Sequence, residues 1–226
     1  MNNNYQPFTY SQVVEAFEIL NQILPFNVYD ALVTRIAIGL SFEENAKKIY
    51  NEWNYYLGKP PMQMQDKNKI YGAKFHLTDY YIKGYDKTYQ VKSKDRINLN
   101  KPYFRYEIEG KTKFFNSKTN KININTVADL VNEGKYIKLC NMLVDRYNMI
   151  EKTAKIDYSE CTFKEKKLIA YMGNPNIKQS VNNQHFESFK KDRTTINKLI
   201  KDKCDNKYQN IILDKINQQI QYSINN

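Results

Sequence analysis

Two stretches, Tyr80-Tyr-Ile-Lys-Gly-Tyr-Asp-Lys-Thr-Tyr89 and Tyr103-Phe-Arg-Tyr-Glu-Ile-Glu109, decide the fold that this sequence predicts. Both are rich in the aromatic and β-branched residues that pleated surfaces prefer, and both are typical of β-strands. With a further candidate strand at Tyr71–Leu77, they predict a small antiparallel sheet that includes the strands Tyr80–Tyr85 and Tyr103–Glu109. Lysines and arginines stand beside tyrosines in these strands, so the sheet is also the candidate functional surface.

The residues before the sheet predict one helix followed by one strand. Thr9 and Gln12 have the spacing of a capping box, and apolar residues then recur on one helical face until Pro25. Val33–Leu40 alternates in the manner of a half-buried strand.

A second helix is expected between that strand and the first tyrosine-rich stretch. Ser41 and Glu44 again have capping-box spacing, which predicts a helix running to about Leu57. Gly58-Lys-Pro-Pro-Met62 then breaks the chain before the sheet.

The remainder of the chain is predicted to be helical. The expected helices are Thr126–Asn132, Lys135–Asn148, Thr162–Met172, Asn183–Lys203 and Tyr208–Ile220. Thr162 and Glu165 form a capping-box pattern, Gly173-Asn-Pro175 is a strong stop, and the Asn- and Gln-rich end from Gln218 is expected to fray. A helix, this turn and a second basic helix suggest a helix-turn-helix, although ordinary helical packing explains the spacing equally well.

These elements predict an α+β fold, with a small antiparallel sheet and flanking helices followed by a helical C-terminal region. We expect residues 1–124 to form the α+β part and residues 125–226 the helical part. The length of 226 residues suits one large or two small domains.

Charge is distributed unevenly along the chain. The formal net charge is +11, yet residues 1–66 hold four Lys and Arg against seven Asp and Glu. Residues 67–121 hold fourteen Lys and Arg against five Asp and Glu. Such asymmetry favours a polyanionic partner, above all single-stranded DNA or RNA, whereas the alternative is a lysine-rich surface that is merely solvated.

Metal-site and export signals are missing from the sequence. Cys140, Cys161 and Cys204 are widely spaced, and the two histidines, His76 and His185, stand far apart, so we expect no disulfide, metal or other cofactor. The N-terminus lacks a signal-peptide pattern, and no stretch is long enough to span a bilayer, which favours the cytoplasm of a bacterial host.

Tyrosines interleaved with cations can stack on unpaired bases while the cations hold phosphates. The alternative is that most of these rings pack within the protein. The predicted nucleic-acid-binding residues are Lys74, Tyr81, Lys83, Tyr85, Lys87, Lys92, Arg105, Lys111, Lys113, Lys190, Lys191 and Arg193.

The order of these motifs resembles the later part of rolling-circle replication initiators of filamentous phages and small plasmids. The resemblance covers roughly Phe8 to Met149 and is based on Tyr85-Asp-Lys87, Arg105-Tyr-Glu107 and the helix pattern Thr126-Val-Ala-Asp-Leu130. It implies that Tyr85 corresponds to a nicking tyrosine, with Lys87 and Glu107 as further remnants of a catalytic site.

The sequence departs from the family pattern at the metal site. Where a family strand usually has Arg-x-Asp, this chain has Ala37, and the upstream metal-binding motif is not found. A neutral phenol without a metal ion is a poor nucleophile. We therefore expect a non-catalytic nucleic-acid-binding protein of a phage or mobile element, which could inhibit a host RNA-guided nuclease (an anti-CRISPR role) by engaging the nuclease or its guide RNA.

Three other functions stay open. One is an active metal-dependent nickase, in which Tyr85 attacks DNA, Lys87 and Arg105 hold the phosphate, and Glu107 with His76 binds a metal. The second is a regulator that binds a replication origin, and the third is a protein-interaction module whose charge is only compositional.

Overall fold

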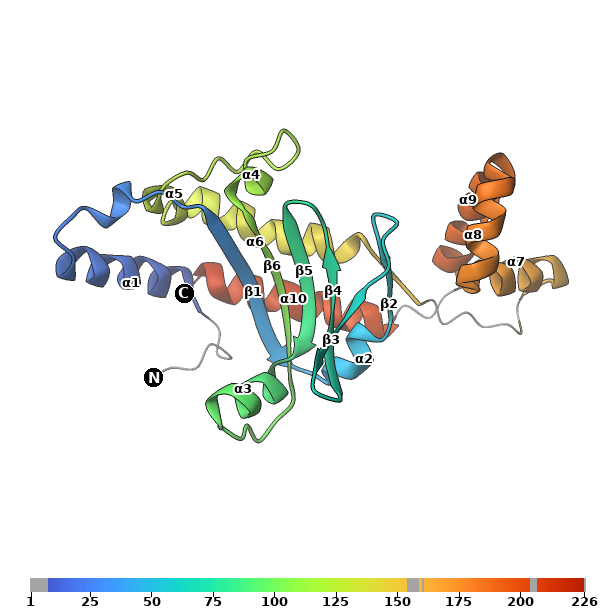
Figure 1. Cartoon of the computed structure of the whole chain (residues 1–226), viewed down its shortest axis with the longest axis horizontal. Coiled ribbons are helices and arrows are strands. Elements are labelled where there is room, and N and C mark those ends of the chain that lie inside the picture. The colour runs from blue at the N-terminus through green and yellow to red at the C-terminus, as the bar shows by residue number, and fades with distance from the viewer. Residues whose placement is uncertain (1–7, 154–158, 160, 204–206, 226) are drawn as a thin grey trace. The chain divides into compact units, whose positions relative to one another are not determined.

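The computed structural model describes residues 8–153, 159, 161–203 and 207–225 (Figure 1). In chain order its elements are α1 (Tyr10–Ile23), a 3-10 turn (Val28–Asp30), β1 (Arg35–Glu43), α2 (Ala46–Tyr50), β2 (Trp53–Tyr56), β3 (Met62–Asp66), β4 (Lys69–His76), β5 (Tyr80–Asp86), α3 (Lys87–Asp95), β6 (Tyr103–Lys111), α4 (Thr112–Phe115), α5 (Val127–Leu130), α6 (Glu133–Asn148), β7 (Ile150–Lys152), α7 (Phe163–Gly173), α8 (Pro175–Gln184), α9 (Phe186–Lys203) and α10 (Lys207–Asn225).

Five strands form one antiparallel sheet in the order β1-β6-β5-β4-β3, and β2 pairs with β7 in a separate two-stranded ladder. The predicted strands at 71–77, 80–85 and 103–109 are confirmed to within two residues at each end. The α+β class, with its antiparallel sheet and helical C-terminal region, is likewise confirmed.

One face of the sheet forms the main hydrophobic core. Phe75, Ile82, Phe104, Tyr106 and Ile108 alternate onto this face and are fully buried. The ring of Trp53 stacks on Phe75, and the hydroxyl of Tyr106 donates to the carbonyl of Leu143 in α6. Helices α6 and α10 cross the sheet on this side (Figure 1), so the opposite, polar face is the one left for binding.

Two predicted boundaries, at the end of β1 and in the helix after it, are wrong. Strand β1 continues through Ser41 to Glu43, because this segment pairs with β6, and the cap of the short helix α2 is Asn45 instead. Helix α2 ends at Tyr50 and β2 follows, so the predicted helix to Leu57 does not form. Only the first part of the Tyr80–Tyr89 stretch is a strand, because the side chain of Asp86 accepts from the Tyr89 N–H and caps α3.

Several predicted helix ends are confirmed. Thr9 and Gln12 form the expected capping box of α1, and this helix ends at Ile23, just before Pro25. Thr162 and Glu165 form the capping box of α7, which ends at Gly173. The expectation of a frayed C-terminal end is wrong, because α10 continues to Asn225 and Ile220 is only 3% exposed.

The chain divides into two compact units, residues 1–152 with 212–226 and residues 153–211. The expected boundary after residue 124 therefore falls inside the first unit. In the second unit α7, α8 and α9 pack together around Cys161, Ile169, Ile196 and Leu199. The predicted helix at 183–203 is interrupted at His185, so the expected pair of helices around Gly173-Asn-Pro175 is a group of three.

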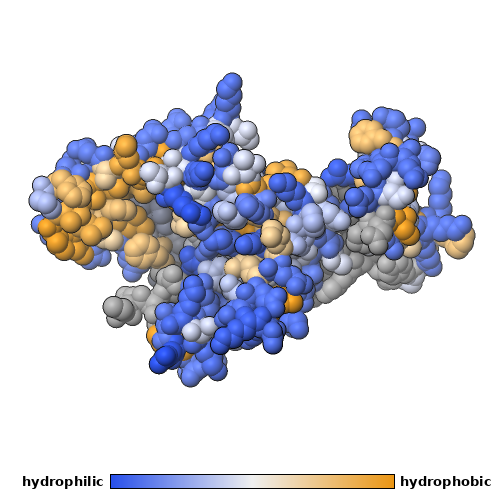
Figure 2. Space-filling view, in the orientation of Figure 1, coloured by the Kyte–Doolittle hydropathy of each residue, from blue (hydrophilic) through white to orange (hydrophobic). Residues whose placement is uncertain are grey.

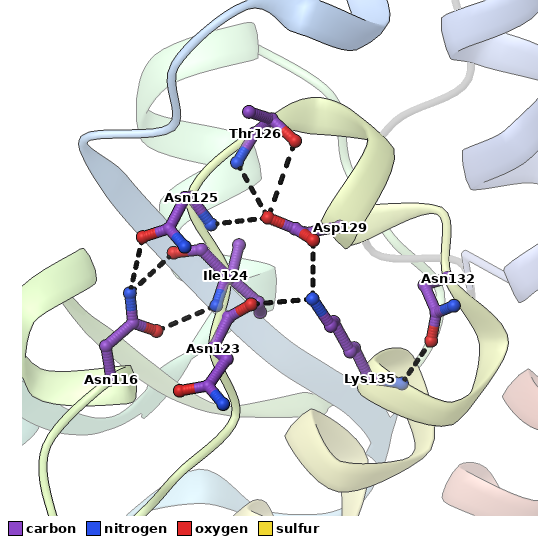
Figure 3. Close-up of polar contacts among 8 residues, drawn as sticks. All are labelled: Asn116, Asn123, Ile124, Asn125, Thr126, Asp129, Asn132 and Lys135. Carbon is purple, nitrogen blue, oxygen red and sulfur yellow. Dashed lines mark hydrogen bonds and ion pairs between the residues drawn. The ribbon is translucent and has the colours of Figure 1, made fainter.

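Asp129 organises the connection between the sheet and α6 (Figure 3). Its carboxylate accepts from the backbone N–H groups of Asn125 and Thr126 and pairs with Lys135. The fixed segment places the carbonyl of Asn125 2.8 Å from the backbone nitrogen of Val33, directly before β1. This contact fixes one end of the edge strand.

Among the described residues, no helix is long and apolar enough to cross a membrane.

Candidate nucleic-acid interface

The strand register places about half of the predicted site residues in three rows on the polar face of the sheet. The three rows, each running from β4 to β1, are Gly72–Tyr85–Arg105–Ser41, Lys74–Lys83–Glu107–Gly39 and His76–Tyr81–Glu109–Ala37. Side chains of residues paired in this way lie on the same face. Six residues named from the sequence as binding or catalytic candidates therefore share one surface, namely Lys74, Tyr81, Lys83, Tyr85, Arg105 and Glu107.

Glu107 is the centre of an ionic network on this face. Its Oε1 lies 3.0 Å from Nζ of Lys83, and its Oε2 lies 2.9 Å from Nε of Arg105. Burial by itself would raise the pKa of Glu107, but Arg105 and Lys83 outweigh it and hold the pKa below its usual value. Glu109 extends the network by pairing with both Lys83 and Arg35. Three cations thus face two carboxylates.

Tyr85 is buried within this network and is only 4% exposed. Its hydroxyl donates to Oε2 of Glu107 at 3.0 Å. Burial raises the pKa of the phenol far above its ordinary value, and the negative charge of Glu107 raises it further. A phosphodiester cannot reach this oxygen in the described arrangement, and the phenol is held in its neutral form.

Lys87 differs from the other predicted cations because its side chain is almost fully buried at the start of α3. Its Nζ donates to the side chain of Gln90. Burial, together with the positive charge of Arg105, lowers the pKa of Lys87 to about 8. Because Lys87 is only 4% exposed, its ammonium group is not accessible to a phosphate in solution.

The accessible aromatic group of this face is a stacked pair, His76 and Tyr81. Their ring centroids are 4.6 Å apart, and the ring planes differ by 22°. His76 is exposed and Tyr81 is half-buried. The cation of Lys83 lies 6.0 Å from the Tyr81 ring centroid, and Lys74 occupies the neighbouring row. Flat rings beside lysines are what stacking on an unpaired base requires.

The remaining predicted cations lie outside the three rows. Lys111 is the last residue of β6, Lys92 is exposed on α3, and Lys113 is exposed on α4, 3.8 Å from Asp79. Lys190, Lys191 and Arg193 are exposed on α9 in the second unit. The sheet therefore does not bring all twelve predicted residues into one site.

The arrangement does not favour the metal site suggested for an active nickase. His76 and Glu107 lie on β4 and β6, with β5 between them. Strands are about 4.8 Å apart, so the backbones of the two residues are separated by roughly 10 Å. Both oxygens of Glu107 already accept hydrogen bonds, from Lys83, Tyr85 and Arg105. Within the described ranges, no group of three His, Cys, Asp or Glu residues is placed to hold a metal.

Sequence reasoning missed two parts of the site. Arg35 joins the ionic network, and Gly39 packs so closely against β6 that an added Cβ would lie 2.5 Å from Cβ of Glu107. Both depend on the pairing of β1 with β6, which alternation within either strand does not reveal. The stacking of His76 on Tyr81 also requires the β4–β5 register.

No known protein family matches this chain, and a search of curated proteins found no similar sequence.

Proposed function

We propose that this protein binds single-stranded nucleic acid on the polar face of its sheet and does not cleave it. The observation that carries the proposal is the His76–Tyr81 stack beside Lys74, on the face opposite the hydrophobic core. A base can stack on exposed rings whatever its identity, and nearby lysines then track the backbone. The high positive charge of the chain supports the same partner.

The ionic network restricts which cations serve as phosphate ligands. Lys83, Arg105 and Arg35 are already paired with Glu107 and Glu109. An arriving phosphate would have to compete with these carboxylates. We therefore assign phosphate contacts to the cations at the borders of the face, Lys74 and Lys111, with Lys92 and Lys113 as outer contacts.

A second candidate is strand cleavage through Tyr85, and one observation favours it. The phenol oxygen lies within hydrogen-bonding distance of a carboxylate, as a nucleophile and its base must. Two features oppose it. Tyr85 is buried, and the three donors around Glu107 make that carboxylate a weak base. Inhibition of an RNA-guided nuclease is a narrower role that stays a prediction from the sequence.

The binding test uses fluorescence anisotropy with labelled oligo(dT), oligo(U) and a duplex at several salt concentrations. We expect single strands to bind more tightly than the duplex, with an affinity that falls as salt rises. Tyr81→Ala should weaken binding on the order of tenfold, because a stacked base is worth about 1–3 kcal/mol. Unchanged affinity in this variant would contradict the proposed surface.

A charge-matched pair of variants separates a specific surface from general attraction. Lys74→Ala with Lys111→Ala removes two charges from the proposed surface. The control pair, Lys47→Ala with Lys48→Ala, removes two positive charges from exposed positions on α2. This helix lies outside the proposed surface and is followed by Trp53, on the apolar side of the sheet. Only the first pair should reduce both affinity and its salt dependence. Equal losses in the two pairs would favour unspecific attraction.

A covalent adduct with DNA in the presence of Mn²⁺, lost in Tyr85→Phe, would instead establish cleavage.

A further inference from the structure

Strand β1 is an unprotected edge of the five-stranded sheet. It is nine residues long and pairs with β6 without a register shift. The opposite edge, β3, is five residues long and has a register shift between Met64 and Gln65. Short, bulged strands are a usual protection against pairing with another chain, whereas long regular edges invite it. The two edges of this sheet therefore differ in what they allow.

The outward-facing backbone groups of β1 follow from the hydrogen bonds at its two ends. Thr112 N donates to Thr34 O at 3.1 Å, and Glu44 N donates to Pro102 O at 3.0 Å. In an antiparallel ladder only alternate residues bond to a given neighbour. Since residues 34 and 44 bond toward β6, the even residues between them do so as well. The N–H and C=O groups of the odd residues point away from the sheet.

The two ends of this outer edge are occupied, and the middle is open. Asn125 accepts from the N–H of Val33, and Nζ of Lys215 donates to the carbonyl of Glu43 at 3.0 Å. Between these contacts lie the outward groups of Arg35, Ala37, Gly39 and Ser41. Across the described parts of the chain, no residue forms a backbone hydrogen bond with them on that side.

A cavity of about 770 Å³ runs along the open edge. Every residue from Arg35 to Ser41 lines it, so it reaches both sides of the strand. Parts of α1, α6 and α10 form the other walls. Phe8 and Ile19 line it from the α1 side and are 58% and 48% exposed. Figure 2 shows an apolar patch over α1, a helix whose exposed apolar residues include Ile19 and Ile23.

We propose that this edge pairs antiparallel with the same strand of a second copy, centred on Gly39. The strand reads Arg35-Ile-Ala-Ile-Gly-Leu-Ser-Phe-Glu43 and is self-complementary about its middle. In this register Arg35 lies opposite the partner's Glu43, and Ala37 lies opposite the partner's Ser41. The polar side thus has small residues at its centre and opposite charges at both ends.

The backbone restricts the alternatives to this register. A shift of one residue would place inward-bonded residues opposite outward-bonded ones, so the new ladder could not form. A shift of two residues keeps the ladder but separates Arg35 from the partner's Glu43. Within one copy Arg35 pairs with Glu109 and Glu43 pairs with Lys101, but their side chains are still 57% and 51% exposed, so each can also contact the partner copy. The dimer would join two sheets into one and place both polar faces on the same side.

The test is the oligomeric state of the full chain by sedimentation equilibrium over a concentration series. We expect a reversible dimer. Arg35→Glu and Glu43→Arg each place like charges opposite one another at two symmetric positions, and each should weaken dimerisation at least tenfold. The double variant restores opposite charges and should regain most of the affinity. Lys101→Glu is the control, because it removes the contact of Glu43 with Lys101 inside one copy but leaves the proposed pair intact.

A backbone variant tests the same edge without changing charge. Ala37→Pro removes an outward N–H that β6 does not use, so the chain should stay folded and become monomeric. Circular dichroism and urea unfolding at low protein concentration check the fold. A wild-type protein that stays monomeric throughout would overturn the proposal. A dimer that survives Ala37→Pro, or that the double charge variant does not rescue, would overturn it as well.

Discussion

The phenol oxygen of Tyr85 lies 3.0 Å from Oε2 of Glu107, and that carboxylate also pairs with Lys83 and Arg105. The four side chains come from two adjacent strands and satisfy one another on a face that is otherwise polar. This relationship makes Tyr85 a structural hydrogen-bond donor, and it makes Glu107 the residue on which the network depends.

Removal of Glu107 is expected to destabilise the fold more than removal of the Tyr85 hydroxyl. Glu107→Ala removes a buried carboxylate that pairs with two partly buried cations, Lys83 and Arg105, which should cost about 3 kcal/mol. Tyr85→Phe removes one hydrogen bond and should cost about 1 kcal/mol. Urea unfolding followed by circular dichroism measures both. Lys113→Ala, whose side chain is mostly exposed, should stay within about 0.5 kcal/mol of wild type. Equal effects of the two network variants would contradict the assigned roles.

Lys87 should give the protein a distinctive dependence on alkaline pH. Its pKa of about 8 in the fold lies below the value of about 10.4 expected in the unfolded chain. Between these values the unfolded chain binds more protons, so the free energy of unfolding should rise as pH increases from about 8. Below pH 8 Lys87 is charged in both the folded and the unfolded state, and its burial then lowers the free energy of unfolding.

The comparison is wild type against Lys87→Met in urea unfolding at a series of pH values from 7 to 9.5. The variant should be the more stable protein at pH 7, and its advantage should shrink toward pH 9.5. Tyrosine ionisation affects both proteins and cancels in the difference. Lys92→Met, at an exposed position of the same helix, should show no such trend. A constant difference for Lys87→Met across the range would mean that the lysine is not destabilised by burial.

The sequence predicts the strands of the sheet well because their pattern is local. Apolar and polar residues alternate along β5 and β6, and this alternation also places Glu107 and Glu109 on one face. The error at Ser41 shows where local patterns fail. Its spacing to Glu44 suits a helix cap, yet pairing with β6 keeps Ser41 in a strand and brings its hydroxyl to Arg105. That choice is made by a contact with a distant part of the chain.

The candidate site is less predictable for the same reason. Tyr85 and Lys87 are two residues apart and look like an exposed pair in the sequence. The structure buries both, because the strand ends at Asp86 and the chain continues as α3, which packs against β6. The role of Arg35 and the fit of Gly39 likewise depend on which strand lies next to β1.

Gly39 should tolerate no larger residue. A Cβ at this position would lie 2.5 Å from Cβ of Glu107 and 2.7 Å from the carbonyl oxygen of Tyr106, so the two strands would have to separate. Gly39→Ala should therefore lower the free energy of unfolding by about 1–3 kcal/mol. Gly134→Ala is the matched control, since its Cβ would meet only Asn132 Oδ1 at 3.5 Å and Ala favours a helix. This control should be neutral or slightly stabilising in urea unfolding, and a neutral Gly39→Ala would show that β1 and β6 lie farther apart.

The C-terminal helix α10 should contribute to the stability of the first unit despite its Asn- and Gln-rich sequence. Ile212, Ile216 and Ile220 recur every four residues on one side of the helix and are buried. Lys215 adds an ion pair with Glu44 at 2.7 Å.

Ile220→Ala should lower the free energy of unfolding by about 2–4 kcal/mol, as truncation of a buried aliphatic residue does. Ile211→Ala, at a position that is exposed in the same helix, should cost less than about 1 kcal/mol. Thermal or urea unfolding of the full chain distinguishes the two. If Ile220→Ala proves as mild as Ile211→Ala, the end of α10 does not pack against the first unit.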